Sequence, residues 1–202
     1  MKENNLKKIK TITLDDNHIY RVNGQVKPSV SEIMRPLSED YYSDAFGTTN
    51  RKFIHSRLEK RRQIGSDVHD GIETYLLFGV YDPSVEEYLT QFKKWIEKED
   101  IEIIRTEQRL TNDIYCGTID LYVKERKKDK YILVDIKATA KINKPLIEVQ
   151  LAAYKELLDH NKIKVDETKS LHLRTKGYTY KNVAINIWKW KELLENYEKQ
   201  TY

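Results

Sequence analysis

Three runs of sequence decide the fold: Thr106-Glu107-Gln108-Arg109-Leu110, Gly117-Thr118-Ile119-Asp120-Leu121 and Ile132-Leu133-Val134-Asp135-Ile136-Lys137. Each is rich in β-branched or other apolar residues, which is typical of β-strands. Thr111-Asn112-Asp113 separates the first two runs as a turn, and the polar residues 124–130 separate the last two as a hairpin loop. The pattern therefore predicts consecutive strands over residues 101–110, 114–123 and 131–136.

The second and third of these predicted strands carry two aspartates and a lysine that could meet on one face of the sheet. Asp135 and Lys137 are two residues apart, so on a strand they point to the same face, while Ile136 points into the core. Asp120 lies on the preceding strand, and a modest bulge would bring its carboxylate near Asp135. Two facing carboxylates repel unless a cation lies between them, and oxygen ligands favour Mg²⁺ or Mn²⁺. Such an ion would polarise a phosphoryl group, and Lys137 would position or activate the attacking water.

Longer amphipathic patterns flank the three strands. A helix is predicted over residues 53–78, with Ile64, Val68, Ile72 and Leu76 as its buried stripe. Further helices are predicted after Asp82-Pro83-Ser84, from Pro145 to Leu158, and from Trp188 to Tyr197. An N-terminal hairpin and two later strands, over residues 171–174 and 178–187, complete the predicted elements. Alternating helices and strands indicate a single α/β domain with a mixed sheet.

The order of motifs resembles the PD-(D/E)XK nuclease superfamily, whose core motif is similar to Asp120 followed by Asp135-Ile136-Lys137. The RecB-like branch of phage and bacterial exonucleases has further motifs that this chain matches: an acidic residue on the strand before (Glu107), G-x-x-D (Gly117 to Asp120), Q-x-x-x-Y (Gln150 to Tyr154) and G-x-x-x-H (Gly65 to His69). The matches span roughly residues 65–154. The resemblance implies a restriction-endonuclease-like mixed β-sheet core flanked by helices over residues 28–202, preceded by an N-terminal arm and hairpin over residues 1–27.

The resemblance also implies roles for individual residues. A histidine on a helix is by itself more often a polar or core residue than a ligand, but His69 matches a metal ligand of the RecB-like branch. His69, Asp120, Asp135 and the backbone carbonyl of Ile136 would hold Mg²⁺ or Mn²⁺. Glu107 would assist that ion or a second one, and Lys137 would act on the attacking water. Gln150 and Tyr154 would contact DNA or orient Lys137, and Lys141 and Arg61 would contact phosphates.

The implied function is metal-dependent hydrolysis of DNA phosphodiester bonds, as an exonuclease in phage or bacterial recombination, repair or replication. Two alternatives remain open on the sequence: a structure-specific endonuclease, and a catalytically inactive DNA-binding or protein-interaction module on the same fold. DNA is the expected partner. A phage recombinase or annealing protein, and assembly into an oligomer, remain open as well.

Composition bounds these expectations. The chain has 202 residues, enough for one sizeable core, and its Lys+Arg count of 36 against 32 Asp+Glu gives a net charge of +4, which permits nucleic-acid binding. The single cysteine, Cys116, excludes an internal disulfide framework and a four-cysteine iron–sulfur cluster. The sequence has no long apolar run, so we expect no membrane span and a cytoplasmic location in a bacterium or phage-infected host.

Overall fold

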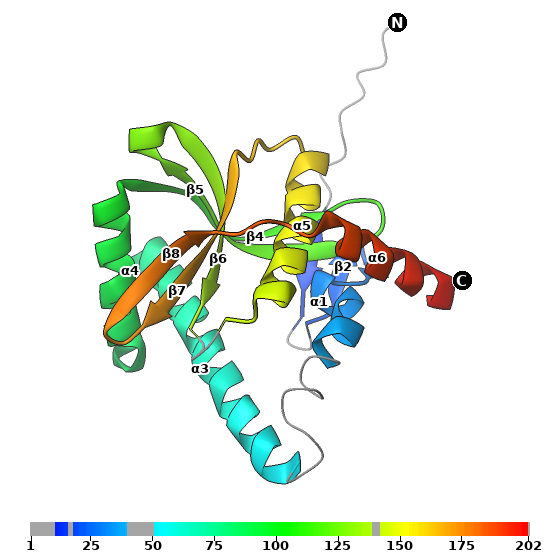
Figure 1. Cartoon of the computed structure of the whole chain (residues 1–202), viewed down its shortest axis with the longest axis horizontal. Coiled ribbons are helices and arrows are strands. Elements are labelled where there is room, and N and C mark those ends of the chain that lie inside the picture. The colour runs from blue at the N-terminus through cyan, green and yellow to red at the C-terminus, as the bar shows by residue number, and fades with distance from the viewer. Residues whose placement is uncertain (1–10, 16–17, 40–50, 139–141, 202) are drawn as a thin grey trace, which may run out of the picture.

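The computed structural model describes residues 11–15, 18–39, 51–138 and 142–201, and side chains within these ranges except those of residues 51–62 and 201. A five-stranded mixed sheet forms the centre, and helices cover both of its faces (Figure 1). The predicted class, a single α/β domain with a mixed sheet core flanked by helices, is therefore confirmed.

The strands of the central sheet lie in their chain order: β4 (Ile101–Thr111), β5 (Cys116–Glu125), β6 (Lys130–Lys137), β7 (Glu167–Arg174) and β8 (Gly177–Asn182). The β6 and β7 strands are parallel, and every other neighbouring pair is antiparallel. Parallel neighbours need a crossover connection, which α5 (Lys144–His160) supplies between them. The three predicted strands are thus neighbours, and they place residues 107, 120 and 135 on adjacent strands.

The central sheet divides the core into two layers, and helices cover each of them. The long α3 (Arg51–Phe78) and α4 (Glu86–Glu99), which follows the short η1 (Pro83–Val85), pack against Leu121, Val134 and Ile136. On the other face, α1 (Val30–Ile33), α5 and α6 (Ile187–Thr201) pack against Ile119 and Leu133. No helix in the described ranges is both long and apolar enough to cross a membrane.

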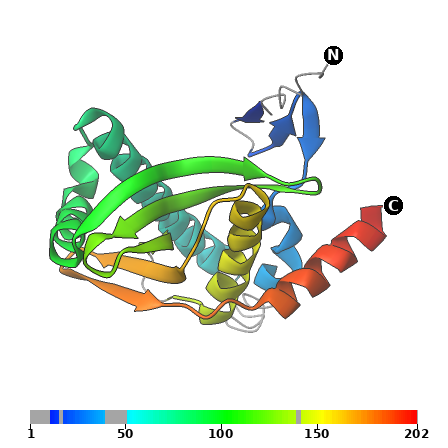
Figure 2. The ribbon, with the colours of Figure 1, turned by 90° about the horizontal axis from the view of Figure 1, so that it is seen from above.

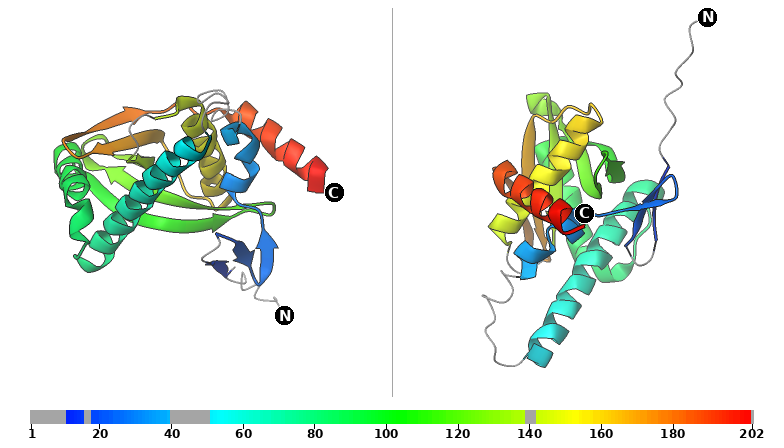
Figure 3. Two further views of the ribbon diagram at one scale, coloured as in Figure 1. Left: turned by 90° about the horizontal axis from the view of Figure 1, so that it is seen from below. Right: turned by 90° about the vertical axis from the view of Figure 1, so that its right-hand side faces the viewer.

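A second, three-stranded sheet lies beside the turn that joins β4 to β5 (Figures 2 and 3). Its strands β1 (Ile12–Leu14), β2 (Tyr20–Val22) and β3 (Gln25–Lys27) are antiparallel. The sequence predicts only the first two, because a three-residue strand with two polar residues carries almost no pattern. The sheet is attached to the main one where the Cys116 N–H donates to the Pro28 carbonyl, at 2.9 Å.

Two expectations about burial are wrong. Ile64, expected within the buried stripe of α3, is 44% exposed, whereas Val68 and Ile72 are buried as expected. Glu125, expected in an exposed loop, belongs to β5 and is 1% exposed. A charged side chain at that depth needs a partner, and Lys169 of β7 supplies it, with Nζ 2.7 Å from Glu125 Oε1.

Candidate active site

The candidate site forms where β5 separates from β6. Their backbone pairing runs from Glu125↔Lys130 to Leu121↔Val134 and ends there. Beyond it, the Ile136 N–H donates to Asp120 Oδ2 at 2.6 Å, so that a side chain replaces the missing backbone partner. Ile119 and Leu121, which would share a face of a regular strand, lie in opposite layers of the core. The alternation of side chains along β5 is therefore broken at Asp120, and the Asp120 carboxylate lies at the fork.

Glu107 faces this fork from β4. It lies between the register pairs Thr106↔Leu121 and Gln108↔Ile119, which puts it opposite Asp120. Its φ of 42° is in the left-handed region. A non-glycine residue in that conformation costs about 1–2 kcal/mol, and such strain persists where the surroundings enforce it, often at functional sites. The local distortion aims the Glu107 carboxylate toward α3.

His69 meets the fork from α3, where the buried side chains of Val68 and Ile72 fix the orientation of the helix. Its Nδ1 lies 3.4 Å from Glu107 Oε1 and 3.8 Å from Asp120 Oδ1, and its Nε2 lies 3.1 Å from the Ile136 carbonyl oxygen. One donor atom from each of His69, Glu107 and Asp120 lies within 4.8 Å of the other two. One imidazole and two carboxylates thus converge on a common point.

The electrostatics of this group favour a bound cation. Burial alone would lower the pKa of His69, but the carboxylates of Asp120 and Glu107 raise it to about 9. For the two carboxyl groups, burial acts in the opposite direction. It raises the pKa of Asp120, and it raises the pKa of Asp135 to about 6. Burial is the main cause of these shifts, and His69 and Lys137 oppose them. When ionised, the three carboxylates of Glu107, Asp120 and Asp135 still outnumber these two basic side chains, so the group lacks positive charge. A hard divalent ion with oxygen and nitrogen ligands would provide that charge, so the donor set fits Mg²⁺ or Mn²⁺.

Lys137 forms the second half of the site together with α5. Its Nζ lies 2.8 Å from both carboxylate oxygens of Asp135 and donates to Gln150 Oε1 at 3.2 Å. Gln150 Nε2 in turn donates to the Tyr154 hydroxyl at 3.3 Å. Asp135 is buried, whereas the Lys137 side chain is 27% exposed. Its ammonium group is therefore oriented by fixed partners, and part of the side chain is exposed.

Two motif glycines lie in contrasting surroundings. A Cβ on Gly117 would stand 2.7 Å from Tyr154 Cε1 and 3.0 Å from Val30 Cγ2, so the close approach of α5 to β5 requires a glycine there. A Cβ on Gly65 would meet nothing within 4 Å. The open space beside Gly65 is therefore free of described protein atoms.

The structure brings most of the expected site residues together, with one change of grouping. Glu107, expected to assist, stands in the central group with His69 and Asp120, whereas Asp135 lies beside it and bridges to Lys137. Lys141 lies outside the described residues, as does the side chain of Arg61. Two buried polar residues of β7, which no motif indicated, are the register partners of site residues: Ser170 of Asp135, and His172 of Lys137.

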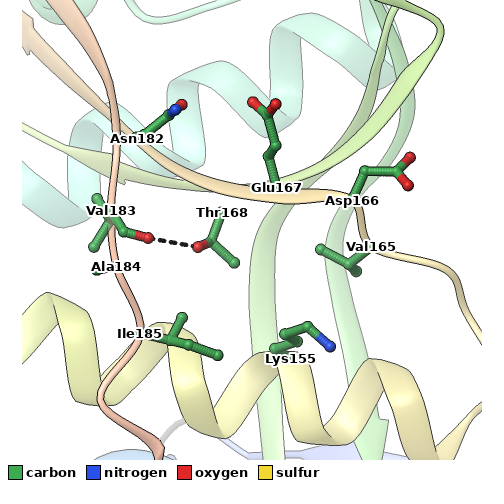
Figure 4. Close-up of a pocket in the computed structure, with 9 residues that line it drawn as sticks. All are labelled: Lys155, Val165, Asp166, Glu167, Thr168, Asn182, Val183, Ala184 and Ile185. Atoms are coloured by element: carbon green, nitrogen blue, oxygen red, sulfur yellow. Dashed lines mark hydrogen bonds between the residues drawn. The ribbon is translucent and has the colours of Figure 1, made fainter.

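A cavity of about 430 Å³ lies elsewhere, between α5 and the strands β7 and β8 (Figure 4). None of the expected site residues lines it. Three of its polar side chains are already paired: Lys155 Nζ donates to Asp159, the Thr168 hydroxyl donates to the Val183 carbonyl, and Asp166 accepts from the Tyr131 N–H. We therefore assign it no part in the chemistry.

Comparison with known proteins finds similarity only at the level of structure. No protein-family model and no curated protein matches the sequence. Among solved structures, a phage-related exonuclease from Haemophilus somnus aligns with 63% of this chain and 76% of its own, at 15% identity and a TM-score of 0.35. An alkaline exonuclease from Laribacter hongkongensis aligns with 86% of this chain and 87% of its own, at 9% identity and a TM-score of 0.44.

Proposed function

We propose that this protein is a divalent-metal-dependent nuclease that hydrolyses phosphodiester bonds of DNA. The observation that carries the proposal is the fork between β5 and β6, where one imidazole and two carboxylates converge beside an oriented lysine. A structural ion pair would balance its charges within the protein, whereas here the three carboxylates of Glu107, Asp120 and Asp135 outnumber the two basic side chains, His69 and Lys137. The excess of negative charge supports a role in binding a cation.

His69, Glu107 and Asp120 would hold the ion, and Asp135 would link it to Lys137. A bound Mg²⁺ or Mn²⁺ would neutralise charge on the phosphoryl oxygens and lower the pKa of a bound water. Asp120 also has a second role, because its contact with the Ile136 N–H fixes the backbone whose carbonyl group faces His69. The expected carbonyl ligand at Ile136 would become available when His69 Nε2 gives up that contact.

Lys137 would orient the attacking water or stabilise the charge that develops on the phosphate. Asp135 and Gln150 hold its Nζ, and Tyr154 holds Gln150, so the Q-x-x-x-Y motif acts on Lys137 in this arrangement. Burial raises the pKa of Tyr154 well above its usual value, which keeps the hydroxyl protonated. Of the two roles that the resemblance left open for these residues, the contacts favour orientation of the lysine.

We infer further that the enzyme is an exonuclease, an inference that rests on the motif resemblance to the RecB-like branch. The expected test uses linear DNA labelled separately at its 5′ and 3′ ends, incubated in Mg²⁺, in Mn²⁺ and in chelator. Metal-dependent release of one label before the other would support an exonuclease and give its polarity. Covalently closed circular DNA is the control, because an enzyme that needs an end leaves it intact.

The matched variant is Lys137→Ala, compared with the wild type under the same conditions. Loss of cleavage in a folded variant would support the assignment of the site. Full activity of Lys137→Ala would show the assignment to be wrong. A wild type that cuts no DNA in either metal would favour the non-catalytic module.

A further inference from the structure

A pair of hydroxyl groups stands next to the acidic group, between the N-terminal sheet and β5. The Tyr20 hydroxyl lies 2.7 Å from Thr118 Oγ1, within hydrogen-bond distance, and either oxygen can be the donor. Two hydroxyl groups that share one hydrogen bond use only one of their two protons. Among the described residues neither hydroxyl has another hydrogen bond. Burial raises the pKa of Tyr20, so its hydroxyl stays protonated and one donor remains available.

An arginine on β4 adjoins the hydroxyl pair. Arg109 is the register partner of Thr118, and it is exposed. Within the ranges for which side chains are described, it makes no ion pair, although Glu107 stands only two residues away on the same strand. A guanidinium group without an ion pair among the described side chains, together with an available hydroxyl donor, forms a set that suits the oxygens of a phosphate.

The position of this set relative to the metal-binding residues is fixed by strand geometry. Gly117 and Ile119 both face the α5 layer, so Thr118 between them faces the opposite side of β5, where Asp120 meets His69 of α3. Two residues along a strand span about 6.6 Å. That step is comparable to the distance between successive phosphates along a nucleic-acid strand. A phosphate in the acidic site would therefore bring its neighbour to Arg109.

The hydroxyl pair is also held in place firmly enough to act as a binding element. Tyr20 is 7% exposed and packs with Val22 and Cys116. Lys27 of the same small sheet donates from Nζ to the carbonyl groups of Asn112 and Asp113, at 2.7 and 2.8 Å, which ties the sheet to the β4–β5 turn. The N-terminal sheet therefore supplies a rigid side chain to the edge of the site.

We propose that Arg109, together with the Tyr20–Thr118 hydroxyl pair, binds the DNA backbone phosphate next to the one that is cleaved. This inference rests on the proposed nuclease function and names a contact that its motifs do not include. The site recognises phosphate oxygens and no base, so it positions the strand without reading sequence. It also gives the N-terminal sheet a direct part in substrate binding.

The test replaces single phosphates of a short DNA substrate by uncharged methylphosphonate linkages, one position at a time on both sides of the cleaved bond. In the wild type, one neighbouring replacement should raise KM about tenfold, the effect of losing a charge-assisted contact. In Arg109→Gln, KM for the unmodified DNA should rise by a similar factor, and the same replacement should add nothing. The salt dependence of DNA binding, measured in chelator, should also fall by about one charge in this variant.

The matched control is Arg105→Gln, which removes the same charge from an exposed position on the same strand. Arg105 is the register partner of Tyr122 and so belongs to the opposite face, toward α5. This variant should keep the response of the wild type to every replacement. Tyr20→Phe and Thr118→Val, which retain shape and lose one hydroxyl each, should raise KM several-fold with kcat unchanged.

Two results would overturn the subsite, and they are distinguishable. If the wild type cleaves DNA and Arg109→Gln responds to methylphosphonates as Arg105→Gln does, the phosphate contact is absent and the nuclease assignment stands. If the wild type cleaves no DNA in Mg²⁺ or Mn²⁺, the proposed function fails and the subsite fails with it. Should Arg109→Gln unfold, Arg109→Lys takes its place: it keeps the charge, loses the forked geometry, and should show an intermediate KM.

Discussion

Buried acidic groups lie at the two ends of the pairing between β5 and β6, and they differ in how their charge is balanced. Glu125, at one end, has Lys169 and Lys128 at 2.7 Å from its two carboxylate oxygens. Burial opposes ionisation of Glu125, yet these lysines lower its pKa below the usual value. Asp120, at the other end, shares His69 and Lys137 with two further carboxylates, Glu107 and Asp135, and burial raises its pKa although the two basic side chains oppose the shift. One end is complete without a ligand, whereas the other is stabilised by a proton or a cation.

The charges around Glu125 stabilise the fold, whereas those around Asp120 suit the binding of a ligand. A buried ion pair that is balanced within the protein keeps the same geometry whether or not a ligand is present. An acid-rich group at an opening in the sheet binds protons in the absence of a cation, and its affinity for a cation follows from the same excess of negative charge. We expect substitutions at the two ends to affect different properties of the protein.

The largest expected effect is on catalysis at the acid-rich end. Asp120→Asn should lower the rate of DNA cleavage by about 10³-fold or more, because it removes charge from the proposed ion-binding group. Circular dichroism should show a folded protein, since the asparagine oxygen can still accept from the Ile136 N–H. Single-turnover cleavage of labelled DNA measures the rate. Cleavage at the wild-type rate would show that Asp120 has no part in catalysis.

The opposite outcome is expected at the balanced end. Lys169→Met leaves the buried Glu125 carboxylate with Lys128 alone and should lower the free energy of unfolding by about 3 kcal/mol. Urea denaturation measures that loss. The rate of cleavage by the folded variant should stay near the wild-type value. A variant of wild-type stability, or a folded one without activity, would contradict the division between the two ends.

The two motif glycines provide a smaller contrast. Gly117→Ala should destabilise the protein by about 1–3 kcal/mol, because its Cβ would overlap the Tyr154 ring and disturb the residue that holds Gln150. Gly65→Ala, on an open helix surface, should stabilise by about 0.5–1 kcal/mol, since alanine is the better helix former. Thermal denaturation of both variants tests the pair. Equal effects would mean that their surroundings differ less than the structure indicates.

A pH dependence gives the mildest test of the acid-rich end. The pKa of His69, raised to about 9, means that a bound metal ion must displace a proton at any lower pH. Affinity for Mn²⁺ should therefore rise by about tenfold per pH unit as pH increases toward 9, and level off above it. Calorimetric titration at several pH values measures this slope. His69→Gln should flatten it, and an unchanged slope would exclude His69 as the titrating group.

Much of this architecture could be predicted from sequence because the decisive patterns are local. The alternation around Asp135 and Lys137 places their side chains on one face, and the structure has them in contact. Other features depend on residues distant in the chain. The burial of Glu125 requires Lys169, which lies 44 residues later. The broken alternation of β5 at Asp120 and the left-handed backbone of Glu107 arise from the fork in the sheet, so no pattern around either residue indicates them.

The residues at the edge of the site were missed for the same reason. Tyr20 and Thr118 are 98 residues apart, and each alone is an ordinary strand residue. Arg109 lies in the first of the three strand-forming runs, but its position opposite Thr118 follows only from the β4–β5 register. Motifs of matching residue type indicate the metal-binding chemistry, whereas contacts that position a substrate depend on the packing of one particular chain.

Calorimetric titration of Mn²⁺ into the wild type, Asp120→Asn and Glu125→Gln most directly tests whether the acid-rich end of the β5–β6 pairing binds the metal. Each variant removes one buried carboxylate from β5, at opposite ends of its pairing with β6. We expect a binding isotherm for the wild type and for folded Glu125→Gln, and none for Asp120→Asn. Binding that survives in Asp120→Asn, or that disappears equally in both variants, would contradict this account.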